Sequence, residues 1–459
     1  MKKVLSFLTA VSLVLISGCT KIYNDSSYLQ SDSYGSYTSD VEYIIEDSVS
    51  SVESVISQIE SDLEKQQQSG EVTVSRDTES VSSQVDTANE AGKQIAVVDS
   101  SVDSADAQVI TPADVDTKGE KPLYYNDLTK TQKHIYRCIK SAAENMTEGL
   151  FSIGAVSSGE QNRFSDITVA FRALSADNPQ IFWLPISYVA SSDGSSLALS
   201  YRKNGNNLDY TFSSSQKANA EKQLNAKAAE IIAEAQKLSS RFEKELYFHD
   251  WLCKNVTYGY NGSENCYTAY GALVNGVAVC EGYSRAMQLL CDKVGIPCTV
   301  IYGKSEGIGH MWNIINPGDG WYHLDVTWDD DADFDLARHA YFNLTDAEIK
   351  TDHTIFEAVT PDKSYVGNDL FNISLYQCTS TTYNYFVKKN LVFQNDMAYN
   401  AQRIAQEVSA GNTMPEFKYI LSGKALETFL NELNPQLLNY GLRISQYSKL
   451  GNAVLLGFG

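Results

Sequence analysis

The feature that most constrains this chain is a long stretch without aromatic residues. None occurs between Tyr43 and Tyr124, although 11% of the 459 residues are aromatic. Residues 20–120 hold 5 Lys and Arg against 21 Asp and Glu, and are otherwise rich in Ser and Gln. Such a segment cannot bury enough apolar area to offset the entropy lost on ordering. We therefore expect a disordered acidic tether over 19–120 and a folded body after it.

The net charge limits the partners of the protein. Of the formal charge of −21, residues 1–19 contribute +2, residues 20–120 contribute −16 and residues 121–459 contribute −7. Phosphate binding depends on clustered Lys and Arg, so this charge argues against nucleic acid as a partner. The expected partners are a protein or peptide substrate, with cell-wall peptide as one possibility, and a membrane.

The membrane expectation comes from the first residues. Residues 1–18 place two lysines before an apolar run of thirteen residues, which is shorter than the ~20 that a spanning helix needs. This pattern is typical of a secretory signal peptide. Residues 16–19, Ile-Ser-Gly-Cys, resemble the bacterial lipobox, which implies cleavage before Cys19 and its diacylation. Two acyl chains hold a protein firmly, so we expect a lipid anchor on the extracytoplasmic face of the bacterial cell membrane.

One part of the tether has helical periodicity. Its apolar residues follow a heptad spacing: Ile45, Val49, Val52, Ile56, Ile59 and Leu63. Three heptads that contain many serines form a weak helix, so a transient amphipathic helix and a self-associating coiled coil both stay open. The oligomeric state is therefore not predicted.

The folded body is predicted to be α+β, in three regions: an accessory α+β region at 121–235, a catalytic domain at 236–365 and a C-terminal α/β domain at 366–459. The expected helices cover 126–146, 216–252 with an interruption near Ser239, 396–408 and 424–433. The expected strands cover 167–174, 181–188, 196–201 and 452–456. The C-terminal domain carries no motif with a chemical meaning.

A cysteine stands at the start of a predicted helix. Apolar residues recur with helical spacing after Cys280, and Gly295 and Pro297 are typical of a helix end. The N-terminus of a helix favours negative charge and therefore a thiolate. The neighbouring Glu281 opposes this effect, so a thiolate at Cys280 would also need a cationic partner.

A predicted β-hairpin follows. Residues 309–316 and 321–328 alternate like strands around a Pro-Gly-Asp-Gly turn. If the turn closes symmetrically, the numbers of paired residues add up to 637, and His310 and Asp325 become diagonal neighbours on one face. A bulge would break this inference. Nucleophile, base and orienting acid would then be Cys280, His310 and Asp325, as in acyl transfer.

These residues carry a resemblance to a family. The motifs Val279-Cys280-Glu281-Gly282-Tyr283, His310-Met311-Trp312-Asn313 and Trp321 to Asp329 resemble the bacterial transglutaminase-like superfamily, with Asp352-His353 in a familiar tail. The resemblance covers about 235–365. It implies a papain-like core in which Cys280, His310 and Asp325 form the catalytic triad. The family's oxyanion donor does not transfer clearly, and the candidates are Trp251, Tyr267 and Tyr270.

Other assignments compete with this interpretation. His323 shares the face of Asp325 and could be the base instead. The acidic run from Asp329 to Asp335 lacks the Gly and Glu of a calcium loop, so a solvated loop is expected. No CxxC or HExxH spacing occurs, and neither a metal nor a cofactor is predicted. The remaining cysteines permit disulfides in an exported protein: Cys138, Cys253, Cys266, Cys291, Cys298 and Cys378.

The resulting functional expectation is a thiol enzyme that acts through a thioester on peptide bonds or glutamine amides. A cysteine peptidase or amidase is favoured. A protein-cross-linking transglutaminase starts from the same thiolate and is the first alternative. The second alternative is a non-catalytic surface module that uses the same fold for binding, for which an intact Cys, His and Asp set would have no purpose.

Overall fold

The computed structural model describes residues 95–98, 104–116, 122–154, 163–203, 206–331, 336–356, 376–421 and 423–459. The chain divides into units Met1–Asp86 and Thr87–Gly459, and every described residue belongs to the second. The predicted signal peptide, Cys19 and the heptad segment lie outside the described residues. Within the described part, no helix is long and apolar enough to cross a bilayer. Helices and strands mix along this part, which confirms the α+β class.

The accessory region combines a four-stranded sheet with helices. The sheet order is β1 (Ile95–Val98), β3 (Ser187–Ala190), β4 (Ser196–Ala198) and β2 (Phe151–Ser152), and a hairpin joins β5 (Tyr201–Lys203) to β6 (Asn206–Leu208). The helices are α3 (Leu123–Asp127), α4 (Lys130–Asn145) and α5 (Arg163–Asp177). The strand predicted over 167–174 is wrong, because these residues lie inside α5. That helix is buried on almost every side, so it lacks the polar stripe that reveals a surface helix.

The fold begins before residue 121, so the tether predicted over 19–120 is too long at its C-terminal end. Strand β1 pairs in parallel with β3. The Gln108 N–H donates to the Leu150 carbonyl (2.9 Å), and the Gln108 carbonyl accepts from the Ser152 N–H (2.8 Å). Main-chain hydrogen bonds of this kind attach a segment to a sheet without aromatic residues, so composition did not reveal them.

Two consecutive helices link the accessory region to the cysteine. Helix α6 covers Ser214–Ala235 and α7 covers Arg241–Asn255. Ser240 caps α7, and its hydroxyl accepts from the Glu243 N–H (3.1 Å). The predicted interruption near Ser239 is therefore confirmed, and its cause is a capping box.

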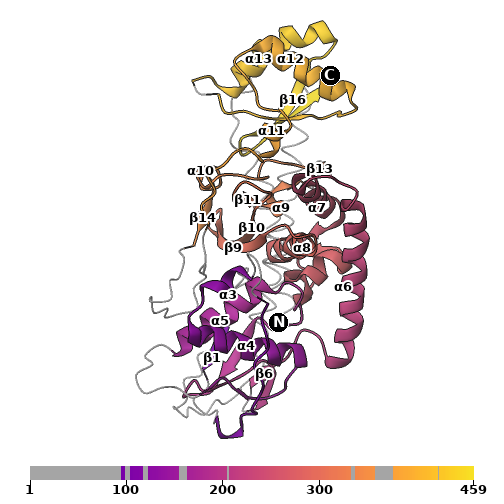
Figure 1. Ribbon diagram of the computed structural model, residues 1–459. Helices are drawn as coiled ribbons and strands as arrows, with labels where there is room; N and C mark the ends of the chain where they lie inside the picture. The colour runs from indigo at the N-terminus through magenta and orange to yellow at the C-terminus, as the bar shows by residue number, and fades with distance from the viewer. Residues whose placement is uncertain are drawn as a thin grey trace, which may run out of the picture. The chain divides into compact units, whose positions relative to one another are not determined.

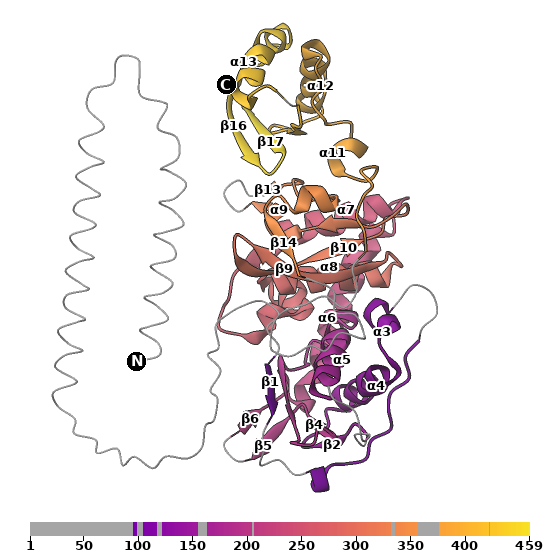
Figure 2. The same cartoon turned by 90° about the vertical axis from the view of Figure 1, so that its left-hand side faces the viewer.

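The central sheet has the order β11 (Tyr322–Leu324), β10 (Ile308–Ile315), β9 (Cys298–Ser305) and β14 (His353–Ile355), and all its pairs are antiparallel. Helix α8 (Cys280–Lys293) packs against β9 and β10 (Figures 1 and 2). Shorter elements surround α8 and the sheet: β7 (Thr257–Tyr258), η2 (Glu264–Tyr267), η3 (Gly271–Asn275), β8 (Val277–Ala278), α9 (Val326–Asp329), β12 (Asp330–Asp331), β13 (Leu336–Ala337) and α10 (Asp346–Ile349).

The C-terminal region contains the predicted helices and the predicted last strand. Its elements are α11 (Tyr385–Lys388), α12 (Met397–Ser409), β15 (Glu416–Lys418), α13 (Leu426–Leu437), η4 (Leu438–Tyr440), β16 (Ile444–Leu450) and β17 (Ala453–Phe458). The strand order is β15-β17-β16. Ile301 and Trp312 of the central sheet are buried in one cluster with Phe417 and Leu456. A second cluster joins α4 and α5 to α8, so the core around α8 continues into the accessory region.

Candidate active site

Cys280 is the first residue of α8, as the sequence predicts, and this helix is 14 residues long. The side chain is buried, with 3% of the residue exposed. Its N–H is one of the four at a helix start that have no partner within the helix. Gly282 allows this helix start to approach η2, because a Cβ there would lie 2.4 Å from the Cys266 carbonyl oxygen. The sequence thus positions both a thiol and a main-chain donor.

The negative charge beside the cysteine is neutralised. Glu281 forms an ion pair with Arg285 (2.7 Å) one helical turn later, and both side chains are about nine-tenths buried. Arg285 also donates to the Ser175 carbonyl (2.5 Å) of helix α5. The carboxylate that would oppose a thiolate at Cys280 therefore has its own cation, which comes from the same helix.

His310 and Asp325 meet. The His310 Nε2 lies 2.6 Å from the Asp325 Oδ2. The predicted register is confirmed where the strands pair, from Asn313 opposite Leu324 to Ile315 opposite Tyr322. The return strand predicted over 321–328 is too long, however.

Strand β11 ends at Leu324, and Asp325 becomes the N-cap of α9. The Asp325 Oδ1 accepts from the Thr327 N–H (3.0 Å) and the Trp328 N–H (3.2 Å). Asp325 thus reaches His310 from the start of a helix, where its carboxylate is held by the N–H groups that it caps, and not as a diagonal neighbour on a strand. The local cause is that the Asp325 side chain satisfies the helix-start N–H groups, which ends the pairing.

The electrostatics favour a charged imidazole. Burial lowers the pKa of His310, but the charge and hydrogen bond of Asp325 and a hydrogen bond with the Cys280 side chain raise it to about 10. Burial raises the pKa of Asp325, whereas its contacts with His310 and His353 hold it well below the usual range. The structure therefore brings the three predicted residues together, with the His310 imidazole between a carboxylate and a thiol.

His353, which has no role in the triad predicted from the sequence, also contacts Asp325. Its Nε2 lies 3.1 Å from the Asp325 Oδ2, and its Nδ1 lies 2.6 Å from the Asp352 Oδ1. Burial lowers the pKa of His353, and the two carboxylates raise it overall. His353 lies on β14, beyond β9, so hairpin geometry could not reveal this contact. The Asp352-His353 motif was the available signal.

His323 is not available as the base, so that alternative is wrong. Its Nδ1 accepts from the Trp312 Nε1–H (3.0 Å), and its Nε2 lies 2.8 Å from the Asp346 Oδ1. Both ring nitrogens are thus engaged away from Cys280. His323 is opposite Ile314, as the register predicts, and it ties β11 to the start of α10.

Two tyrosines lie near the thiol. Burial and nearby charges, that of Cys280 among them, raise the pKa of Tyr267 to about 12. Burial raises the pKa of Tyr258, and the charge of Cys280 adds to the effect. Tyr270 instead donates to the Gln223 Oε1 (2.7 Å), and Trp251 packs against the main core. Tyr267 stays a candidate oxyanion donor, and Tyr258, which the sequence reasoning missed, joins it.

The acidic run after α9 is not a solvated loop in its described residues. Asp329 is fully buried and accepts from the Tyr341 N–H (3.0 Å). The Tyr283 hydroxyl donates to Asp330 (2.5 Å), and Asp331 pairs with Arg338 (3.0 Å). Each of these three carboxylates has a partner, so the expectation of a solvated loop is wrong for residues 329–331, whereas Asp333 and Asp335 lie outside the described residues.

The described residues contain three groups whose potential ligand atoms lie within 4.8 Å of one another: His310, Asp325 and His353; His323, Asp346 and Cys378; and His249, Asp250 and His339. The first belongs to the candidate active site. All seven described cysteines are free, so the disulfides that the six cysteines other than Cys19 and Cys280 permitted are absent from this part of the chain.

Comparisons with known proteins agree with the sequence motifs. Residues 225–326 match the profile of the transglutaminase-like superfamily, and this segment contains Cys280, His310 and Asp325. The chain therefore carries a transglutaminase-like domain, which at the level of the family supports a papain-like thiol enzyme. No curated protein matches the chain.

Two solved structures are similar to part of the chain. A transglutaminase structure shares 20% identity over 25% of this chain and 33% of its own, with a TM-score of 0.22. A proposed cysteine protease from Cytophaga hutchinsonii shares 20% identity over 24% of this chain and 37% of its own, with a TM-score of 0.21. The chain thus spans about one third of the length of each. Likenesses of this size carry no argument about function.

Proposed function

We propose that this transglutaminase-like domain is the catalytic part of a thiol enzyme that forms a thioester on Cys280. The observation that carries the proposal is the contact of His310 with both Asp325 and the Cys280 side chain. The favoured reaction is hydrolysis of a peptide bond or a glutamine carboxamide, which makes the protein a cysteine peptidase or amidase.

The geometry suggests the steps. His310 holds the proton of Cys280, and the thiolate attacks the carbonyl carbon of the substrate. The oxyanion accepts from the Cys280 N–H, with a Tyr267 or Tyr258 hydroxyl as a second donor. The C–N bond breaks, the His310 imidazolium gives its proton to the leaving amine or ammonia, and a thioester remains. His310 then takes a proton from water, which attacks the thioester and releases the acid and the free thiol.

The acceptor decides between the candidate reactions. If an amine replaces water in the second half, the same thioester yields a cross-link, as in a transglutaminase. Incubation of the full chain with a peptide library, with and without a primary amine, separates the outcomes by mass spectrometry. We expect cleaved or deamidated peptides in both samples. Amine adducts that exceed the hydrolysis products would contradict hydrolysis and favour the transferase.

The control for this assay is Cys280→Ala. The exchange puts a small side chain in place of a buried one, which should leave the fold intact, and it removes the nucleophile. We expect it to form none of the three products. If the wild-type chain also forms none, yet retains peptides as firmly as Cys280→Ala does, the binding-module alternative is correct.

The proposed location is the extracytoplasmic face of the cell membrane, with the lipid on Cys19. Its support is the sequence of residues 1–19 alone. We expect a palmitate analogue fed to the expressing bacterium to label the wild-type chain and not Cys19→Ala. Equal labelling of the two chains would contradict the anchor.

A further inference from the structure

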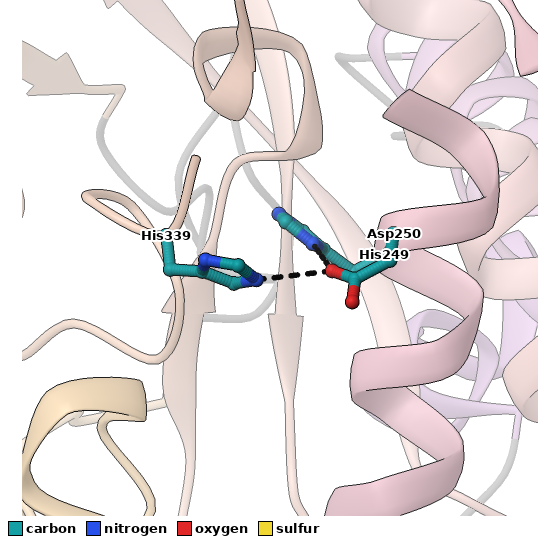
Figure 3. Close-up of side chains that lie close together, drawn as sticks. All are labelled: His249, Asp250 and His339. Carbon is teal, nitrogen blue, oxygen red and sulfur yellow. Dashed lines mark hydrogen bonds and ion pairs between the residues drawn. The ribbon is translucent and has the colours of Figure 1, made fainter. Parts of the chain in front are cut away.

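A second histidine–carboxylate cluster lies outside the candidate active site. His249 and Asp250 belong to α7, and His339 follows β13. Figure 3 shows both imidazole rings pointing toward the Asp250 carboxylate. One Asp250 oxygen, Oδ1, lies 2.9 Å from the His249 Nδ1 and 3.0 Å from the His339 Nε2. The potential ligand atoms of the three residues lie within 4.8 Å of one another.

This spacing fits the coordination of a metal ion. Ligands at ~2.1 Å from an ion, separated by angles of about 90–110°, lie roughly 3.0–3.4 Å apart. The two N···O distances in the cluster are at the lower end of that range or just below it. Small side-chain shifts would therefore suffice to admit an ion. Hydrogen bonds have similar lengths, so the distances alone do not decide between the two arrangements.

The outer contacts of the two histidines supply an independent observation. The His249 Nε2 lies 3.2 Å from the Asp329 Oδ2, and the His339 Nδ1 lies 3.7 Å from the Glu416 Oε2. Each imidazole thus presents one nitrogen to Asp250 and turns the other toward a second carboxylate. Metal-binding histidines almost always have this arrangement, because the outer carboxylate fixes the tautomer and orients the ring.

Those outer carboxylates are themselves held in place. Asp329 accepts from the Tyr341 N–H (3.0 Å), and Glu416 accepts from the His339 N–H (3.0 Å) and pairs with Arg338. The His339 ring also stacks on Tyr385, with ring centroids 3.7 Å apart. The side chains of the site are thus held in position by the protein itself, without an ion.

The cluster is closed on one side and open on the other. The His249 and Asp329 side chains are fully buried and that of His339 is 12% exposed, whereas the Asp250 side chain is 45% exposed. An ion can therefore enter past Asp250, and water can complete its coordination there.

We propose that His249, Asp250 and His339 bind a divalent transition-metal ion, and that Zn²⁺ is the best fit to two imidazoles and a carboxylate. The ion joins α7 to the segment after β13 and, through Glu416, to β15. Its role is structural and does not rest on the chemistry of Cys280. Sequence spacing could not reveal it, because 89 positions separate His339 from Asp250.

The first test is zinc binding by the full chain. The purified chain is stripped with a chelator, titrated with Zn²⁺ by calorimetry, and analysed for metal after dialysis. We expect one bound ion that raises the melting temperature. His339→Gln and Asp250→Asn should lose this ion, whereas Asp329→Asn should bind about 10–100-fold more weakly. His134→Gln, which changes a histidine of α4, and Cys280→Ala should retain it.

The second test does not depend on variants that fold. Co²⁺ is added to the stripped wild-type chain, and its visible and near-ultraviolet spectrum is recorded. We expect d–d bands without a thiolate charge-transfer band, because no cysteine belongs to the proposed site. A thiolate band would place the ion at a cysteine and overturn the proposal. Failure to retain Zn²⁺ would overturn it too, as would equal binding by the wild-type chain and folded His339→Gln.

Discussion

Exchange of His310 for Gln should lower the rate at which iodoacetamide alkylates Cys280 near pH 6 by on the order of 10–100-fold. A free thiol with a pKa near 8.5 is ~0.3% thiolate at that pH. In the wild-type chain the charged His310 is proposed to hold the proton that the Cys280 thiol releases, because Asp325 and Cys280 together raise the pKa of His310 to about 10. Glutamine has no such charge to offer. The measurement is the alkylation rate of the Cys280 peptide by mass spectrometry.

A matched control is available. His134→Gln makes the same exchange on α4, and the alkylation rate of Cys280 should equal that of the wild-type chain. Thermal unfolding of both variants shows whether His310→Gln has lost its fold. If folded His310→Gln is alkylated as fast as His134→Gln, then His310 does not ionise Cys280 and the proposed mechanism is wrong.

Asp325→Asn should reduce turnover of any substrate found in the peptide assay by about 10³–10⁴-fold. The amide cannot stabilise the imidazolium of His310 or hold its tautomer. Asparagine is as good an N-cap as aspartate, so the bonds to the Thr327 and Trp328 N–H groups can persist. The loss would therefore report electrostatics and orientation rather than unfolding of α9.

The same variant has a predicted pH dependence. In the wild-type chain the imidazolium of His310 persists until the pH rises through about 10. Without the Asp325 charge, burial should lower the pKa of His310, so the alkaline limb of activity moves to lower pH. An unchanged alkaline limb, together with turnover within tenfold of wild type, would show that Asp325 does not act on His310.

The parts of the site that could be predicted depend on local signals. The position of α8 follows from two local signals. Helical spacing begins after Cys280, and Gly295, just past the helix, has the left-handed conformation (φ 72°) of a helix end. The register of β10 and β11 follows from a short turn and strict alternation. The contact between His310 and Asp325 was expected from that register. In the structure Asp325 makes this contact as the N-cap of α9, because β11 ends one residue earlier.

The parts that could not be predicted depend on contacts between distant segments. Helix α5 lacks a polar face because other elements cover it all round, so its sequence resembles that of a strand. His353 reaches Asp325 from a strand that lies across β9. The His249 and His339 rings meet through folding of the whole body. Such positions depend on tertiary packing, which leaves no periodic pattern of apolar residues in a single sequence.

The central claim is that Cys280 is ionised by His310, and the pH profile of its alkylation in the full chain tests this most directly. Limited access of iodoacetamide to the buried thiol scales every rate equally, so the shape of the profile decides. We predict a rate that changes little from about pH 5 to 8, because the thiolate–imidazolium pair already exists there. A rate that rises about tenfold per pH unit toward pH ~8.5, as for a free thiol, would contradict the account.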